Sequence, residues 1–165
     1  MKKVLTLLTV FLLFTDMAAG QKVHRIGIIG LDTSHSTAFT ELLNGDNLED
    51  PYVRDFEVVA AYPYGSKTIA SSYERIPGYI REVQKFGVQV VDSIDALLEL
   101  CDYVLLETND GHPHLEQAAQ VFRSGKTCYI DKPLGATLAQ VLAIRELARQ
   151  YGAPVFSSSA LRFSP

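Results

Sequence analysis

Residues 25–35 decide the fold class: Arg25-Ile26-Gly27-Ile28-Ile29-Gly30 runs directly into Leu31-Asp32-Thr33-Ser34-His35. The first six residues form a short apolar run that ends at a glycine, which is typical of a strand buried on both faces of a sheet. The turn that follows offers three helix-capping residues: Asp32, Thr33 and Ser34. Residues 35–43 then place three apolar side chains on one helical face: Phe39, Leu42 and Leu43. The stretch therefore predicts a strand, a tight turn and a helix, in that order.

The same alternation of strand and helix continues along the rest of the chain. Further strands are predicted at residues 56–62, 88–91, 102–108, 127–130 and 155–156, with one helix inside 68–86 and others at 94–100, 114–123 and 138–151. Strands that alternate with helices imply right-handed crossovers and a parallel sheet. The predicted fold class is therefore α/β, a doubly wound parallel sheet with helices on both faces, in a single domain.

The composition of the chain limits the class of protein and the partners that it can bind. The 165 residues are 47% hydrophobic and 21% charged, which describes one soluble globular domain with a real core. The formal net charge is −4 and no basic cluster is present, so nucleic acid is excluded as a partner. The two cysteines are Cys101 and Cys128, and Cys128 lies in an apolar strand pattern. We interpret Cys128 as a small core residue rather than as half of a disulfide.

The first twenty residues have the pattern of a cleaved Sec-type signal peptide. Lys2 and Lys3 precede an apolar run over residues 4–14, and the small residues Ala18, Ala19 and Gly20 follow it. This run is shorter than the roughly 20 residues that span a bilayer. We therefore expect residues 1–20 to be removed, residues 21–156 to form the domain, and the protein to be periplasmic or extracellular without a membrane anchor.

In doubly wound sheets, ligands bind beyond the carboxyl ends of the strands, at the point where the strand order reverses. A dinucleotide fingerprint there would place glycines at positions 30, 32 and 35, and only Gly30 is kept. Asp32 at the second position is expected to add bulk and a negative charge facing the pyrophosphate, although the helix N-terminus still offers N–H groups. The second strand is not followed by a ribose-binding carboxylate. Ser66 and Lys67 there would suit a 2′-phosphate, and a solvated turn is an equal alternative.

Later motifs carry a family resemblance. In order, they are Thr108-Asn109-Asp110, His114, Ala118-Ala119, Gly125-Lys126 and Asp131-Lys132-Pro133. This ordered set resembles the N-terminal domains of the Gfo/Idh/MocA family of oxidoreductases, from about Arg25 to the end of the chain. The resemblance implies a Rossmann-type domain that binds NAD or NADP.

The resemblance also implies roles for individual residues. Lys132 matches the lysine that contacts nicotinamide and the substrate hydroxyl, and Asp131 replaces a more common glutamate that positions it. Pro133 matches a proline that often follows a cis bond. His114 opens the helix after the fourth strand, where we expect it to cap the helix or pack on the turn. The expected cofactor-binding residues are Gly30, Asp32, Thr33, Ser34, His35, Ser66, Lys67, Thr108, Asn109, Asp110, His114, Lys132 and Pro133.

The implied activity is hydride transfer on a sugar or polyol hydroxyl. The resemblance implies that family members continue into a second α/β domain, and residues 157–165 resemble the crossover into it. We therefore expect a truncated chain that lacks turnover by itself, and a homo-oligomer is compatible with the family.

Two alternatives stay open. One is a non-catalytic nucleotide- or carbohydrate-binding module. The other is a metal site for Zn²⁺ or Mn²⁺ at the switch point, built from Asp32, His35, Asp110, His112 and His114.

Overall fold

The structure is a computed structural model, and it describes residues 24–46, 51–159 and 162. Its elements in chain order are β1 (His24–Ile29), α2 (Ser34–Asn44), β2 (Phe56–Tyr62), α3 (Ala70–Tyr73), α4 (Ile76–Lys85), β3 (Gln89–Val90), α5 (Ile94–Leu100), β4 (Tyr103–Leu106), α6 (His114–Arg123), β5 (Thr127–Ile130), α7 (Leu138–Tyr151) and β6 (Val155–Phe156). This alternation confirms the predicted α/β class.

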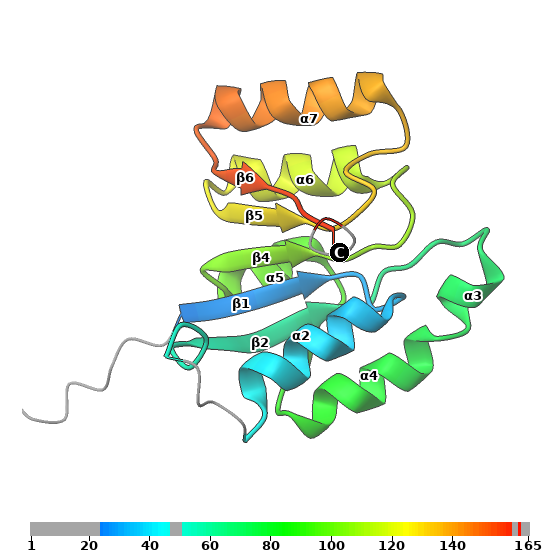
Figure 1. Cartoon of the computed structure of the whole chain (residues 1–165), viewed down its shortest axis with the longest axis vertical. Helices are drawn as coiled ribbons and strands as arrows, with labels where there is room; N and C mark the ends of the chain where they lie inside the picture. Colours follow the sequence, from blue (N-terminus) through cyan, green and yellow to red (C-terminus); the bar gives the residue numbers. More distant parts are fainter. Residues whose placement is uncertain (1–23, 47–50, 160–161, 163–165) are drawn as a thin grey trace, which may run out of the picture.

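The strands form a parallel sheet in the order β3-β2-β1-β4-β5-β6. The order reverses between β1 and β4, which confirms the predicted switch point. Helices α2 and α4 cover one face, and α5, α6 and α7 cover the other (Figure 1). All carboxyl ends of the strands therefore meet at one edge of the sheet.

The core is divided by the sheet into two apolar clusters, because successive side chains of a strand point to opposite faces. Ile28 belongs to the cluster under α2 and α4, with Val58 and Val83. Its neighbour Ile29 belongs to the cluster under α5, α6 and α7, with Phe122 among others. This two-sided burial explains why residues 25–30 read as a continuous apolar run rather than an alternating one.

The buried face of α2 differs from the predicted one. Ser36, Thr40 and Leu43 face the core, whereas Leu42 is 52% exposed and Phe39 is half-buried. The two hydroxyls donate to the carbonyls of Thr33 and Ser36, at 2.7 and 2.8 Å, so their burial leaves no donor unpaired. Apolar periodicity could not reveal a buried face built from satisfied hydroxyl groups.

Three other predicted boundaries also change. Residues 68–86 hold two helices rather than one, since α3 ends before α4 begins. The third and fourth strands are shorter than predicted, at Gln89–Val90 and Tyr103–Leu106. The fourth strand ends at Leu106, so Glu107 lies just beyond it, and the next residue, Thr108, packs closely against Gly30. Cys101 and Cys128 are both buried free thiols, which confirms the prediction made for Cys128.

The predicted signal peptide, residues 1–20, lies outside the described residues, as does part of the predicted crossover at 157–165. Both stay predictions. Within the part of the chain that the structure describes, no helix has the length and apolar character needed to cross a membrane.

The turn after β1 depends on the absence of a side chain at Gly30, which has φ +98°. A Cβ there would lie 2.5 Å from the Thr108 backbone nitrogen. We expect Gly30→Ala to lower the free energy of unfolding by about 3 kcal/mol or more, because backbone strain and a backbone clash add. Gly125→Ala is the matched control, since Gly125 has φ +73° but open space around it. It should lose only about 1 kcal/mol. Equal losses in urea unfolding would contradict the close approach.

Candidate functional site

The carboxyl edge of the sheet carries the turns that the sequence predicts as functional. Gly30 ends β1, Ser66 and Lys67 follow β2, and Thr108 follows β4. Asp131 follows β5, and the Lys132–Pro133 peptide bond next to it is cis. The structure therefore brings the predicted site residues to one edge, and their contacts show what each one does.

Asp32 is completely buried and holds three turns together. One carboxylate oxygen accepts the Ser66 N–H at 3.1 Å, and the other accepts the Asn109 N–H at 3.0 Å. Gly65 packs so closely that a Cβ there would lie 2.8 Å from the Asp32 Cβ. Burial raises the pKa of Asp32, and the two backbone N–H groups oppose that rise. The expectation that this carboxylate faces the pyrophosphate is wrong, because the charge is turned inward between the loops.

Ser66 and Asp110 continue this network. The Ser66 hydroxyl is buried and donates to the Asp110 carboxylate at 3.1 Å, so it is already engaged within the protein. Asp110 also accepts the His112 N–H at 3.0 Å, and this hydrogen bond lowers the pKa of Asp110. Lys67, one residue along, is exposed at the same turn. Of the two residues predicted to bind a 2′-phosphate, Lys67 is the one whose side chain is accessible to a ligand.

His114 is fully buried at the first turn of α6. Its Nε2–H donates to the Thr108 carbonyl at 2.7 Å, so the ring packs on the turn as predicted. Burial lowers the pKa of His114, because it disfavours the charged form of the ring, so the neutral form is favoured at this position. His114 thus positions the turn that contains Thr108 and Asn109.

Lys132 and Asp131 form the contact that the sequence predicts. The Lys132 Nζ lies 3.2 Å from Asp131 Oδ2, with the lysine side chain 45% exposed and the aspartate buried. The Tyr129 hydroxyl donates to the other Asp131 oxygen at 3.3 Å. Asp131 is thereby fixed, and it holds the amine of Lys132 at the edge of the sheet.

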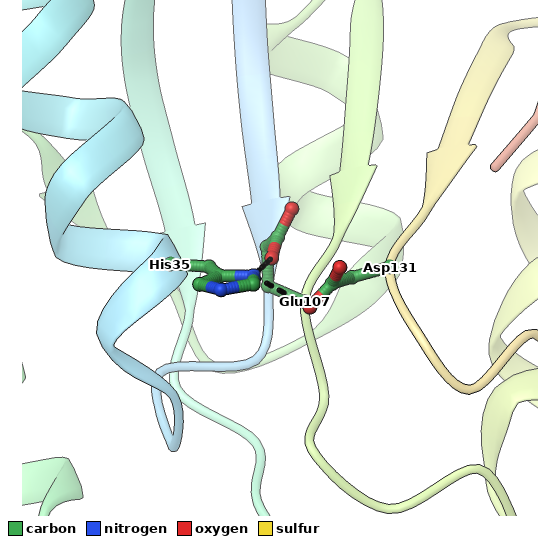
Figure 2. Close-up of side chains that lie close together, drawn as sticks. All are labelled: His35, Glu107 and Asp131. Carbon is green, nitrogen blue, oxygen red and sulfur yellow. Dashed lines mark hydrogen bonds and ion pairs between the residues drawn. The ribbon is translucent and has the colours of Figure 1, made fainter. Parts of the chain in front are cut away.

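His35 reaches from the first turn of α2 to the ends of β4 and β5 (Figure 2). Its Nδ1 lies 2.8 Å from Asp131 Oδ2 and 4.0 Å from Glu107 Oε2. Burial first, and then the charge of Asp131, raise the pKa of Glu107 to about 8. Two carboxyl groups and one imidazole thus meet at one point beside Lys132.

The residues proposed for a metal alternative do not gather as one set. Among the described residues, the group whose potential ligand atoms lie within 4.8 Å of one another is His35, Glu107 and Asp131. Asp32 binds backbone N–H groups, and His114 binds a backbone carbonyl. Sequence reasoning missed Glu107. The available signal was an acidic residue directly after the apolar run Tyr103–Leu106, where a buried strand ends.

The protein has the strand order and the tight glycine turn of Rossmann-type nucleotide-binding domains. Lys132 lies just beyond the end of β5. The family model described as "Oxidoreductase family, NAD-binding Rossmann fold" matches residues 24–159. The chain therefore belongs to the Gfo/Idh/MocA family, as its motifs indicated. None of the curated protein sequences matches it.

Solved structures share the fold at low sequence identity. An NAD-binding protein from Listeria innocua is 22% identical with a TM-score of 0.62, over 86% of this chain and 37% of its own. Biliverdin reductase from Synechocystis, in complex with biliverdin and NADP⁺, is 23% identical with a TM-score of 0.59, over 81% and 37%. A 3-ketoreductase from Actinomadura kijaniata, in complex with TDP-benzene and NADP, is 23% identical with a TM-score of 0.59, over 82% and 38%. The chain thus spans little more than a third of the length of these proteins.

The variant Asp32→Asn tests how much the hydrogen bonds of the Asp32 carboxylate contribute to stability. The amide keeps the shape but turns an NH₂ group toward a backbone N–H, so one hydrogen bond is lost and a buried donor is left unpaired. We expect a loss of about 2 kcal/mol in the free energy of unfolding, measured by urea denaturation. Asp46→Asn, at an exposed position, is the control and should change stability by less than about 0.5 kcal/mol. An unchanged or more stable Asp32→Asn protein would show that desolvation of the charge outweighs its hydrogen bonds.

The buried ring of His114 predicts a pH dependence. Because its folded-state pKa lies below the ordinary value of 6.5, the unfolded chain binds the proton more tightly. The stabilising contribution is complete above pH 6.5 and is lost as the pH falls toward the folded-state pKa. Urea unfolding at pH 7.5 and 5.5 should therefore show a smaller acid-induced change for His114→Gln than for the unaltered protein. Parallel changes in the two proteins would exclude a neutral buried ring.

Proposed function

We propose that this domain binds NAD or NADP at the carboxyl edge of its sheet and supplies Lys132 to hydride-transfer chemistry. The observation that carries the proposal is the contact between Asp131 and Lys132, which holds the amine beyond β5 and beside the β1–β4 switch point. The family match supports the same ligand.

The residues at the edge fit a nucleotide. Gly30 lets the turn after β1 pass close to the Thr108 backbone, and α2 begins just beyond this turn with its N-terminal N–H groups. Asp32 occupies a position that is usually glycine, but its charge is buried and hydrogen bonded, so it is not presented to a phosphate. Thr33, Ser34 and Asn109 lie on the same turns. In this proposal these residues hold the pyrophosphate, and Lys67, exposed at the turn after β2, binds a 2′-phosphate.

The nicotinamide, when bound, supplies the site at which hydride is accepted or released. In reduction, the Lys132 ammonium gives a proton to the substrate carbonyl oxygen while hydride reaches the carbonyl carbon, which yields an alcohol and a neutral amine. In oxidation the neutral amine takes the hydroxyl proton while hydride leaves the carbon. Asp131 orients the amine for both directions and balances its charge.

A sugar or polyol hydroxyl is the proposed substrate group. The support comes from the family resemblance. Turnover and any homo-oligomer are properties that we assign to proteins of the length of these neighbours. For the 165-residue chain itself, the direct readout is nucleotide binding.

Calorimetric titration of the purified protein with NADH and NADPH tests the proposal. We expect 1:1 binding with a dissociation constant in the micromolar range or tighter. Lys67→Ala should weaken NADPH binding roughly fivefold, the size expected for one exposed charge pair, and leave NADH binding unchanged.

Lys126→Ala is the matched control, because Lys126 precedes β5 and lies at the opposite edge of the sheet. It should leave the binding of both nucleotides unchanged. If neither nucleotide produces heat in the titration, the domain does not bind the dinucleotide and the proposal fails.

A further inference from the structure

Glu107 is a buried carboxyl group without a hydrogen-bond partner. Its side chain has no exposed surface, and among the described residues neither of its oxygens is within hydrogen-bond reach of a donor. Burial of an unpaired polar group costs free energy, and native proteins leave few such groups unexplained. Other buried carboxylates at this edge are satisfied, such as Asp32 by two backbone N–H groups. Glu107 therefore points to a partner from outside the chain.

Two further ligand-type side chains face Glu107 from other elements. His35 comes from the first turn of α2, and Asp131 comes from the end of β5 (Figure 2). The His35 Nδ1 is 2.8 Å from Asp131 Oδ2 and 4.0 Å from Glu107 Oε2, and all three ligand atoms lie within 4.8 Å of one another. One imidazole and two carboxylates thus converge on a single small volume.

We propose that His35, Glu107 and Asp131 bind one divalent transition-metal cation of the Zn²⁺ or Mn²⁺ type. Imidazole together with carboxylates is a ligand set that suits these cations. With metal–ligand bonds of about 2.0–2.2 Å, ligand atoms of one shell lie about 3 to 3.5 Å apart. The two separations from His35 Nδ1, 2.8 and 4.0 Å, lie on either side of that range, and all three ligand atoms lie within 4.8 Å of one another, so the side chains would have to adjust to surround one ion.

The site is open on one side. The His35 side chain is 34% exposed, and His35 and Asp131 both line a groove of about 650 Å³ between α2 and the sheet, whose other lining side chains are mostly apolar. The groove gives a cation a way in, and it leaves room for water to complete the coordination. The bound ion would lie beside the Asp131 carboxylate that also holds Lys132. This proposal does not depend on nucleotide binding.

The test is calorimetric titration of chelator-treated protein with Zn²⁺ and, separately, with Mn²⁺ at pH 7.5. We expect one ion per chain with micromolar affinity or tighter for at least one of the two. Glu107→Gln keeps the shape of the side chain and removes the carboxylate ligand, and His35→Gln removes the nitrogen ligand. Each variant should weaken binding by roughly 100-fold or more, because loss of an outer partner alone costs about 10- to 100-fold.

The matched control is His112→Gln. His112 and Asp110 form another close imidazole–carboxylate pair, at 2.7 Å, but they belong to no such three-residue group among the described residues. This variant should bind the ion as the unaltered protein does. Loss of binding in His112→Gln, together with normal binding in Glu107→Gln, would place the ion elsewhere and overturn the proposal.

Thermal unfolding separates a binding defect from a folding defect. The ion should raise the Tm of the unaltered protein by mass action and leave the Tm of Glu107→Gln unchanged. That variant should unfold cooperatively without metal, since a neutral amide of the same shape replaces the buried carboxyl group. Absence of stoichiometric binding of both ions by the unaltered protein would show that neither cation occupies this cluster, and would refute the metal site.

Discussion

The buried carboxylate of Asp32 is the interaction on which the functional edge of this protein depends. The turns after β2 and β4 have no regular secondary structure, yet both donate a backbone N–H to Asp32 in the turn after β1. In the low dielectric of the interior such charge-assisted hydrogen bonds are strong, and leaving them unmade is costly. One side chain therefore sets the relative positions of three turns. The turn that holds Asn109 is also fixed by His114, which donates a hydrogen bond to the Thr108 carbonyl.

Four of the carboxyl groups at this edge, those of Asp32, Glu107, Asp110 and Asp131, have different hydrogen-bond partners. Asp32 receives backbone N–H groups, and Asp110 receives a backbone N–H, a hydroxyl and an imidazole. Asp131 is held by an imidazole, an amine and a phenol hydroxyl. Only Glu107 among these four is left without a hydrogen bond, and its burial raises its pKa. This contrast is the physical reason to look for a cation at Glu107 rather than at Asp110, whose hydrogen bonds are satisfied within the chain.

The observations that show the family of this protein do not show its substrate. The family rests on a match over residues 24–159 and on the strand order. Its neighbours include proteins solved with biliverdin and with a TDP-linked ligand, so the shared domain does not determine the substrate. What this chain contributes by itself is an edge that orders the turns around Lys132. The substrate class stays a proposal that rests on the longer relatives.

The sequence by itself determined the α/β layers of the fold and the edge of the sheet at which the site lies. Residues 25–30 had to be a doubly buried strand, and glycine at position 30 had to end it, because local apolar pattern and backbone freedom are encoded within a few residues. The sequence also indicated Lys132 and Asp131 through an ordered motif set. Only the tertiary structure decided that Asp32 turns inward and that Glu107 meets His35. These outcomes depend on atoms 34 to 77 residues apart in the chain, which no local pattern records, and on where strand β4 ends.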